Sequence, residues 1–365
     1  MPEPATLVQP APRARVRAMK EYHPPLGSRD GLRLDFNENT VACSPAVRDV
    51  LARISAGELT RYPERESVEA VVAAHLGLAP AQVALTNGVD EAIHVLFEAF
   101  LDEGDELLLP VPTYTMYEVY ASATDARVVT VLAGDDLQFP FAQLASSITA
   151  RTKIIAIANP NSPSGTMASR ERILELARLA PQAVILVDEA YFHFCGETVM
   201  DLVGTIPNLI VARTFSKAYG LAGLRVGVLA GPVELMHWIR RVLSPYSVNS
   251  VALACLPAAL EDKAYLDWYA GEVLAARAEF EKALEAARVR YCPSRANFVL
   301  VDIGPRHKDF VRHMLAAGVL VRDRSSDPGC DGRVRITIGT REQMMKAVAA
   351  MNDALAKIRA KETAE

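Results

Sequence analysis

The stretch Ala212-Arg213-Thr214-Phe215-Ser216-Lys217-Ala218-Tyr219, followed by Gly223-Leu224-Arg225, decides the fold of this 365-residue chain. Its first residue ends a short apolar run, residues 209–212, that we predict to be a buried β-strand. Two hydroxyls, a lysine and an arginine eight residues further on can surround a phosphate and leave the lysine amine free to react. A Ser-Lys pair alone carries little weight because exposed lysines are common, so the neighbouring segments must decide.

Strands and helices are predicted to alternate on both sides of this stretch. Helical segments such as residues 90–101 and 169–179 are expected, and Ser169 is a suitable N-cap for the second. Nearly continuous apolar strands are expected where helices cover both faces of a sheet. The pattern predicts an α/β fold with a mainly parallel, seven-stranded sheet flanked by helices. Six further segments have this strand character: residues 82–86, 106–109, 127–131, 153–158, 183–187 and 225–229.

Beyond residue 260 the pattern changes to that of a smaller α+β domain. There we predict helices at 265–287, at 308–317 and from 342, and strands at 297–302, 319–322 and 334–338. The expected domain organisation begins with a tail at 1–21 that becomes ordered only near Tyr22. It continues with a segment at 22–60 that contributes to the small domain, a large domain at 61–262 and the small domain at 263–365.

Three other polar clusters fall at predicted strand ends, where open α/β sheets bind ligands. In Thr86-Asn87-Gly88-Val89-Asp90-Glu91, Gly88 permits a tight turn, and the next amides face a bound anion at a helix N-terminus. The segment Asn159-Pro160-Asn161-Ser162-Pro163-Ser164-Gly165 has the composition of an irregular loop. Asp188 ends the most hydrophobic run of the chain, and a buried carboxylate there requires a cation. Each cluster alone has an ordinary structural explanation.

Taken in this order, the four clusters resemble those of the fold-type I enzymes that use pyridoxal 5′-phosphate (PLP), and specifically the class I and II aminotransferases. The resemblance extends from about Tyr22 to the final helix and rests on the order and spacing of the clusters. It implies that Lys217 holds the cofactor as a Schiff base and moves the proton at the substrate α-carbon. It also implies that Asp188 pairs with the pyridine nitrogen and that Tyr191 hydrogen-bonds the phenolic oxygen.

The same resemblance assigns the remaining cofactor contacts. Tyr114 is expected to stack on the pyridine ring. Tyr62 is expected to reach the phosphate from the second subunit of a homodimer. Where the family usually has Asn-Pro-Thr-Gly, this chain has Ser162-Pro163-Ser164-Gly165, so Ser162, a water molecule or Asn161 must supply the contact to the phenolic oxygen. The phosphate itself is expected to lie among Gly88, Val89, Asp90, Thr214, Ser216 and Arg225.

Within the class, the chain resembles the histidinol-phosphate aminotransferases. This likeness implies transfer of the amino group of L-histidinol phosphate to 2-oxoglutarate, a step of histidine biosynthesis that gives imidazole acetol phosphate and L-glutamate. Arg335 is then expected to bind the substrate's anionic end and the carboxylate of glutamate, while Arg322 and Tyr22 bind the substrate phosphate. Asn37, Glu38 and Tyr22 are candidates to face the imidazole. The likeness rests on Leu34–Asn39, Arg61–Glu64, Val321–Asp323 and Arg335–Thr340.

Other functions remain open on the sequence alone. An aromatic aminotransferase of the same subfamily can use these residues on phenylalanine or tyrosine, and a threonine-phosphate decarboxylase shares the fold and the phosphate recognition. A PLP-binding transcription regulator needs a winged-helix module longer than the short tail before Tyr22. A nicotinamide-binding Rossmann protein fits poorly because Gly223, Gly227 and Gly231 lack the GxGxxG spacing.

The composition excludes several classes of protein. A net charge of −5 argues against general affinity for nucleic acid or acidic membranes. No apolar stretch reaches the roughly 18 to 20 residues of a membrane span, and the first twenty residues lack an apolar signal core, which predicts a cytoplasmic protein. Five cysteines without a CxxC pair, and seven histidines without HExxH spacing, argue against a disulfide framework and a metal site.

Overall fold

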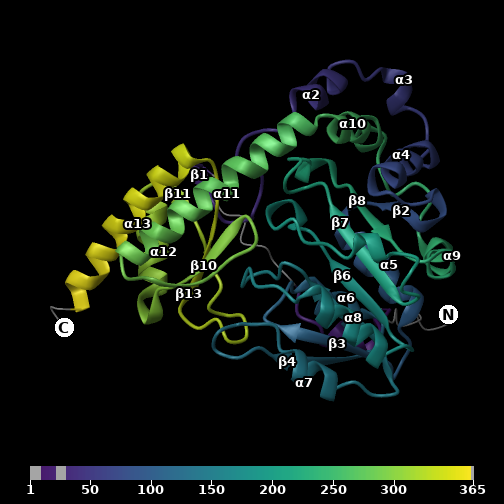
Figure 1. The fold of residues 1–365 in the computed structure, drawn as a ribbon, viewed down its shortest axis with the longest axis horizontal. Coiled ribbons are helices and arrows are strands. Elements are labelled where there is room, and N and C mark those ends of the chain that lie inside the picture. Colours follow the sequence, from purple (N-terminus) through teal and green to yellow (C-terminus); the bar gives the residue numbers. More distant parts are fainter. Residues whose placement is uncertain (1–9, 22–29, 363–365) are drawn as a thin grey trace, which may run out of the picture.

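Seven strands form one twisted sheet in the centre of the larger part of the molecule (Figure 1). The computed structural model describes residues 10–21 and 30–362. The strand order is β2-β8-β7-β6-β5-β3-β4, and only β8 runs antiparallel to its neighbours. This confirms the predicted α/β fold with a mainly parallel seven-stranded sheet. The strands are β2 (Val83–Thr86), β3 (Glu106–Val111), β4 (Arg127–Leu132), β5 (Thr152–Ala158), β6 (Val184–Asp188), β7 (Leu209–Thr214) and β8 (Gly227–Ala230).

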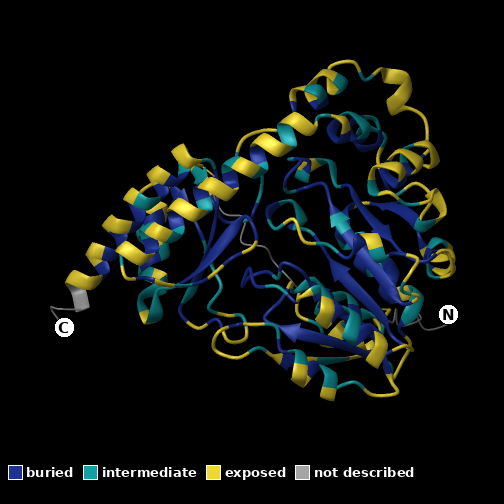
Figure 2. Ribbon diagram, in the orientation of Figure 1, coloured by how far each residue is buried: buried dark blue, intermediate teal, exposed yellow. Residues whose placement is uncertain are grey.

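Helices cover both faces of this sheet, as the continuous apolar strands predicted. Along β5, Ile154 and Ala156 join the hydrophobic cluster on one face, and Ile155 and Ile157 join the cluster on the other. Successive strand side chains point to opposite faces, so a strand covered on both sides needs an apolar residue at every position. Figure 2 shows the buried strands between helices with exposed outer faces. One face carries α5 (Gly88–Phe100), α6 (Met116–Ala123) and α9 (Val233–Val242), and the other carries α7 (Phe141–Ser146) and α8 (Arg170–Leu179).

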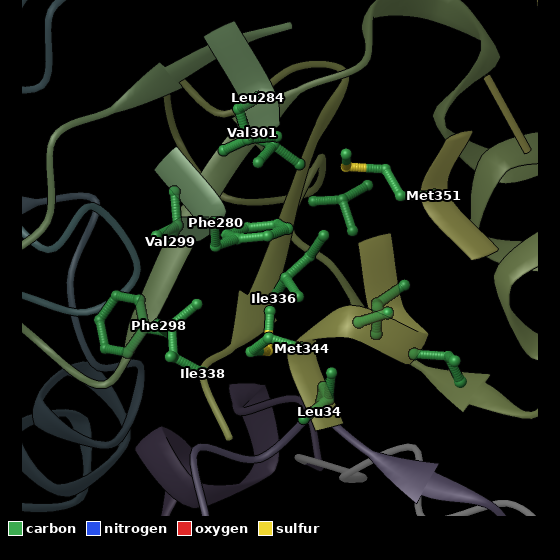
Figure 3. Close-up of a cluster of buried hydrophobic side chains, with 14 of the residues drawn as sticks. Leu34, Phe280, Leu284, Phe298, Val299, Val301, Ile336, Ile338, Met344 and Met351 are labelled. Carbon is green, nitrogen blue, oxygen red and sulfur yellow. The ribbon is translucent and has the colours of Figure 1, made fainter. Parts of the chain in front are cut away.

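The smaller part is an antiparallel sheet in the order β12-β13-β10-β9, packed against three helices. Figure 3 shows its core, in which Phe280 of α11 lies among side chains of β10, β13 and α13. Leu34 of the N-terminal segment joins the same cluster. The elements are β9 (Arg290–Cys292), β10 (Phe298–Asp302), β12 (Arg322–Asp323), β13 (Arg333–Thr337), α11 (Lys263–Ala286), α12 (His307–Ala316) and α13 (Arg341–Glu362).

The expected single strand at 319–322 is wrong. The chain forms two short strands, β11 (Val319–Leu320), which pairs with β1 (Leu32–Arg33), and β12, which pairs with β13. The change of partner at Val321 places Arg322 directly opposite Arg335 across the β12–β13 ladder. The sequence periodicity could not reveal this break. The residues on both sides of Val321 are extended, and a pattern of apolar residues does not show which strand each part pairs with.

The N-terminal tail also differs from expectation. A short helix, α1 (Ala14–Ala18), lies against the end of α6, where Arg13 and Arg15 donate to the carbonyls of Ala123 and Ala126. Cations are favoured at the carboxyl end of a helix, which explains why this basic segment lies there. Ordering therefore begins earlier than near Tyr22.

A third group of helices flanks the β2–β8 edge of the large sheet. Val47 of α2 packs against α10 in a hydrophobic cluster that includes β2 and β8. The group consists of α2 (Pro45–Leu51), α3 (Ala56–Leu59), α4 (Glu66–Leu76) and α10 (Ser250–Glu261).

Within residues 10–21 and 30–362, none of the helices has the length and apolar character that a membrane crossing requires.

Candidate active site

The ends of β2, β5, β6 and β7 meet around a cavity of about 380 Å³, which we call the strand-end cavity. The four polar clusters of the sequence follow these strands, so segments up to 135 residues apart come together here. This is the position at which open α/β sheets bind ligands. Its lining includes Phe36, Glu38, Val89, Asp90, Tyr114, Ser162, Asp188, Tyr191, Thr214, Ser216, Lys217 and Arg225.

One end of the strand-end cavity is suited to an anion. Gly88 opens the 13-residue helix α5 with a φ of +75°, and a Cβ atom on it would lie 2.6 Å from Nη2 of Arg225. Only glycine therefore permits this guanidinium to lie against the helix N-terminus. Arg225 donates to the Asp90 carboxylate at 3.0 Å, and the hydroxyl residues Thr214 and Ser216 line the same cavity. Helix amides, a guanidinium and hydroxyls are groups that bind phosphate in proteins.

The carboxylate of Asp188 lies buried in the same cavity, at the end of β6. Burial raises the pKa of Asp188 to about 6, against the opposing effect of hydrogen bonds from Tyr117 and Ala190. The Tyr117 hydroxyl donates to Oδ2 at 2.8 Å, and the Ala190 amide donates to Oδ1 at 3.0 Å. Tyr117 was not singled out from the sequence. It lies on α6, three residues after Tyr114, and the two rings meet edge to face with 5.8 Å between their centroids.

The N-terminal segment closes the cavity over Lys217 and Tyr191. Nζ of Lys217 donates to the carbonyl of Phe36 at 3.1 Å. The Tyr191 hydroxyl accepts a hydrogen bond from Nδ2 of Asn37 at 2.9 Å, and Oδ1 of Asn37 accepts one from the Thr337 hydroxyl at 3.0 Å. These bonds fix the orientation of the Asn37 amide and connect the larger and smaller parts of the molecule beside Lys217.

A second cavity, of about 250 Å³, adjoins the first, and we call it the arginine cavity. Both cavities share Phe36, Tyr114, Ser162, Tyr191 and Lys217. Four of the described residues that line the arginine cavity are basic and none is acidic. The basic residues are Lys217, Arg322, Arg324 and Arg335.

Arg335 is the most buried of these cations, with 8% of its surface exposed. Its Nη1 donates to the Ser162 hydroxyl at 3.0 Å and its Nη2 to the Asp35 carbonyl at 2.8 Å. Burial, followed by the nearby charge of Arg324, lowers the pKa of Arg335 to about 10. The guanidinium of Arg322 lies 5.2 Å from the ring centroid of Phe36. The arrangement concentrates positive charge beside the lysine amine.

Other residues singled out from the sequence lie elsewhere. The Asn161 amide donates to the Pro112 carbonyl at 2.9 Å and to the Ser164 hydroxyl at 2.8 Å, and Asn161 lines neither cavity. Tyr62 is 79% exposed and its ring lies tilted against that of Tyr246, with 4.6 Å between ring centroids. Tyr22 lies outside the described residues.

Comparison with known proteins identifies the family. The family "Aminotransferase class I and II" matches residues 29–351, most of the chain. The chain belongs to the class I and II aminotransferases. The sequence of this aminotransferase is 34% identical to a histidinol-phosphate aminotransferase of Symbiobacterium thermophilum over 359 residues, which cover 94% of this chain and 98% of the relative. A histidinol-phosphate aminotransferase of Geobacillus sp. (strain WCH70) is 31% identical over 348 residues, covering 93% and 94%.

A solved structure shares the fold of the aminotransferase. The crystal structure of histidinol-phosphate aminotransferase from Sinorhizobium meliloti in complex with pyridoxal-5′-phosphate superposes with a TM-score of 0.86. The two sequences are 23% identical, and the match covers 95% of this chain and 98% of that one. The likeness establishes fold-type I architecture for both parts of the chain.

Class I and II aminotransferases use PLP, which is therefore the cofactor of this chain. The strand-end cavity fits the group on two observations. The close approach of Gly88 to Arg225 leaves a helix N-terminus and a guanidinium available for a phosphate. The buried Asp188 carboxylate needs a cation, and a protonated pyridine nitrogen is one.

Proposed function

We propose that this aminotransferase is a cytoplasmic homodimer that transfers the amino group of L-histidinol phosphate to 2-oxoglutarate, giving imidazole acetol phosphate and L-glutamate. The observation that carries the proposal is the arginine cavity, with four basic and no acidic residues among the described residues of its lining. Both proposed substrates bear anionic groups that such a cavity attracts. The names of the relatives from Symbiobacterium thermophilum and Geobacillus agree with this substrate.

The strand-end cavity holds the cofactor in this proposal. The amides of Val89 and Asp90, with Gly88 before them, bind its phosphate together with Arg225 and the hydroxyls that line that end. When bound, PLP supplies an electron-accepting ring that stabilises negative charge at the substrate α-carbon. Tyr114 stacks on the ring and Thr214 and Ser216 donate to the phosphate.

Asp188 and Tyr191 interact with the two polar atoms of the cofactor ring, the pyridine nitrogen and the phenolic oxygen. With a pKa of about 6, the Asp188 carboxyl is ionised at neutral pH and keeps a proton on the pyridine nitrogen. The Tyr191 hydroxyl, which accepts from Asn37, donates to the phenolic oxygen of the ring. Ser162 lines the cavity on the opposite side and replaces the usual asparagine, because Asn161 is bonded to Pro112 and Ser164 instead.

Lys217 moves the substrate proton in this mechanism. Its amine lines both cavities and is held by the Phe36 carbonyl at 3.1 Å, so it stands between the cofactor and the anionic substrate. As a general base it would remove the proton from the substrate α-carbon and return it at the C4′ atom of the cofactor.

Arg335 and Arg322 position the substrate. Arg335 binds the carboxylate of 2-oxoglutarate and glutamate, since its planar guanidinium suits a bidentate contact. Arg322, opposite it in the β12–β13 ladder, binds the phosphate of histidinol phosphate together with Tyr22. Like charges directly opposite in a sheet repel each other, and a bound anion relieves that repulsion. Asn37, Glu38 and Tyr22 are the candidates to face the imidazole.

The homodimer completes the site in this proposal, because Tyr62 lines neither cavity of its own chain. Tyr62 and Tyr246 form an exposed aromatic pair, with 79% and 56% of their surfaces accessible. Exposed aromatic surface of this kind is typical of interfaces. Mixing Lys217→Ala subunits with Tyr62→Ala subunits should give hybrid dimers with one intact site and restore part of the activity. Equal inactivity before and after mixing would exclude the shared site.

A donor comparison tests the substrate. Purified enzyme should show absorption of the bound cofactor that shifts to the amine form when L-histidinol phosphate alone is added. The shift should be at least roughly tenfold more efficient than with phenylalanine or tyrosine, because each charge-assisted contact to the phosphate contributes about 1.5–3 kcal/mol. A preference for phenylalanine or tyrosine would make the chain an aromatic aminotransferase, and release of carbon dioxide would make it a decarboxylase.

A further inference from the structure

Arg324 is a cation of the arginine cavity to which neither the sequence motifs nor the proposed mechanism gives a role. It follows β12 directly, and its side chain is only 12% exposed. It also lines a larger cavity of about 1110 Å³, the distal cavity, which shares Thr115, Arg322 and Arg324 with the arginine cavity. Arg324 therefore lies between the arginine cavity and the distal cavity. It does not line the strand-end cavity that contains Asp188.

Backbone hydrogen bonds fix the turn that carries Arg324. Its amide donates to the Arg333 carbonyl at 3.0 Å, and its carbonyl accepts from the Asp327 amide at 2.9 Å. The Cys330 amide in turn donates to the Asp327 carbonyl at 3.0 Å, so the turn is tied to the start of β13. A guanidinium on such a turn is held in position before any ligand arrives, which reduces the entropy cost of binding.

Two guanidinium nitrogens at this place have no hydrogen-bond partner among the residues that the structure describes. They are Nε of Arg324 and Nε of Arg335, and Arg335 is more than nine-tenths buried. Buried donors without a partner are rare in folded proteins because each costs free energy. Each of the two arginines therefore has hydrogen-bonding capacity that the described protein groups leave unused.

Arg324 has one printed carboxylate partner and lies close to a second buried guanidinium. Nη2 of Arg324 forms an ion pair with the carboxylate of Asp327. Burial raises the pKa of Asp327, and the neighbouring arginines oppose that effect. Arg324 also contributes to the lowered pKa of Arg335, so the two guanidiniums repel each other across the cavity. An incoming oxyanion can therefore compete with Asp327 for Arg324 and offset the repulsion between Arg324 and Arg335.

We propose that Arg324 is a third anion-binding residue, which recognises the second oxyanion group of a doubly anionic substrate, and that Asp327 is the resident counter-ion with which this group competes. The inference rests on the proposed function for the position of the substrate, since the first anionic group is the one bound by Arg335. It adds a reason for selecting acceptors with two carboxylates, such as 2-oxoglutarate, over those with one, while L-histidinol phosphate has the phosphate as its single anionic group. The phosphate of a donor and the second carboxylate of an acceptor share this chemistry.

Calorimetric titration of the holoenzyme with unreactive ligands tests the inference. Glutarate carries two carboxylates and butyrate carries one, and inorganic phosphate represents the phosphate group. Arg324→Gln should weaken binding of glutarate, phosphate or both by roughly tenfold or more, and that of butyrate by less than about twofold. Loss confined to glutarate assigns Arg324 to the acceptor, and loss confined to phosphate assigns it to the donor. Equal effects on glutarate and butyrate, or no effect on either dianion, would overturn the inference.

Three further variants make the result specific. Arg312→Gln removes an exposed arginine of α12 that pairs with Asp309, and it should change none of the affinities. Asp327→Asn removes the competing carboxylate and should tighten glutarate binding by roughly threefold or more, since the cation keeps its position. Weaker binding in Asp327→Asn would refute the competition. If Arg324→Gln does not fold, the double variant Arg324→Gln, Asp327→Asn removes both charges and carries the same test.

The outcome is separable from that of the proposed function. Enzyme loaded directly with pyridoxamine phosphate can be mixed with 2-oxoglutarate or pyruvate, so no amino donor is involved. Arg324→Gln should raise the half-saturating concentration of 2-oxoglutarate roughly tenfold and that of pyruvate by less than about threefold. If histidinol phosphate fails as donor while this difference holds, the donor assignment falls and the role of Arg324 stands. If the donor is accepted, the difference is missing and Arg324→Gln also leaves phosphate binding unchanged, the donor assignment stands and the role of Arg324 falls.

Discussion

The strand-end cavity and the arginine cavity share a lysine but differ in charge and construction. The first is lined by three acidic and two basic residues, Glu38, Asp90, Asp188, Lys217 and Arg225, and the second by four basic residues and no acidic one among those described. A cofactor with a cationic ring and an anionic phosphate suits the mixed lining, and anionic substrates suit the basic lining. The comparison suggests that one cavity retains a permanent ligand while the other exchanges several anions.

Removing the lysine that both cavities share should abolish cofactor attachment and transamination together, which is the largest effect we expect. Lys217→Ala is expected to lower the transamination rate by roughly 10⁴-fold or more, because it removes both the proton-transfer group and the covalent attachment of the cofactor. Borohydride treatment followed by mass measurement should find no cofactor attached to the variant chain. The control is Lys263→Ala, an exposed lysine paired with Asp267, which should retain both properties. Cofactor still linked in the Lys217 variant would contradict the assignment.

Arg335→Gln should affect substrate binding in the arginine cavity much more than cofactor binding in the strand-end cavity. Loss of two charge-assisted hydrogen bonds to a substrate carboxylate should lower kcat/KM for 2-oxoglutarate by roughly 10²- to 10³-fold. Affinity for PLP should change by less than about threefold, because Arg335 does not line the strand-end cavity. Fluorescence titration with the cofactor gives the second value. A parallel loss of cofactor affinity would mean that the two cavities act as one.

The sequence predicted the strand-end cavity better than the arginine cavity. Lys217 and Asp188 follow apolar runs that end at the same edge of a parallel sheet, so short motifs and the fold class together predict their meeting. The arginine cavity depends instead on the break at Val321, which turns Arg322 toward Arg335 and begins the turn that carries Arg324. No local pattern marks a change of strand partner, so Arg324 was missed.

Small departures from the expected motifs were also decided by packing. The choice between Ser162 and Asn161 could not be made from the segment alone, because both residues belong to one irregular loop. In the folded protein, the Asn161 amide is used to hold that loop, while Ser162 accepts from Arg335. The side chain that reaches the cavity is therefore the shorter one.

Asp188→Asn should change how the stability of the cofactor-free protein depends on pH. In the cofactor-free protein, the pKa of Asp188 is raised from 3.8 to about 6. The stability present when the carboxyl is neutral is therefore lost as the pH rises through 6, and the loss amounts to about 3 kcal/mol. Cofactor-free Asp188→Asn should be more stable than the parent at pH 8 by up to about this value, with the difference falling toward zero near pH 4. Urea unfolding at several pH values measures it, and a difference independent of pH would rule out this cause.

Tyr117→Phe should give the smallest effect. It tests a residue that contacts Asp188 and influences the cofactor only through that carboxylate. The Tyr117 hydroxyl donates to Asp188 at 2.8 Å and lowers the pKa of that carboxyl, against the larger effect of burial. Without it, the Asp188 pKa should rise further, so PLP affinity and kcat should fall roughly threefold to tenfold at pH 6.5 and less at pH 8.5, where the carboxyl ionises in either protein. Tyr120→Phe, on the same helix but stacked on His94, should leave the pH profile unchanged. Equal losses at both pH values would show that the Tyr117 hydroxyl matters through packing alone, and the electrostatic link between α6 and the ring nitrogen would then be wrong.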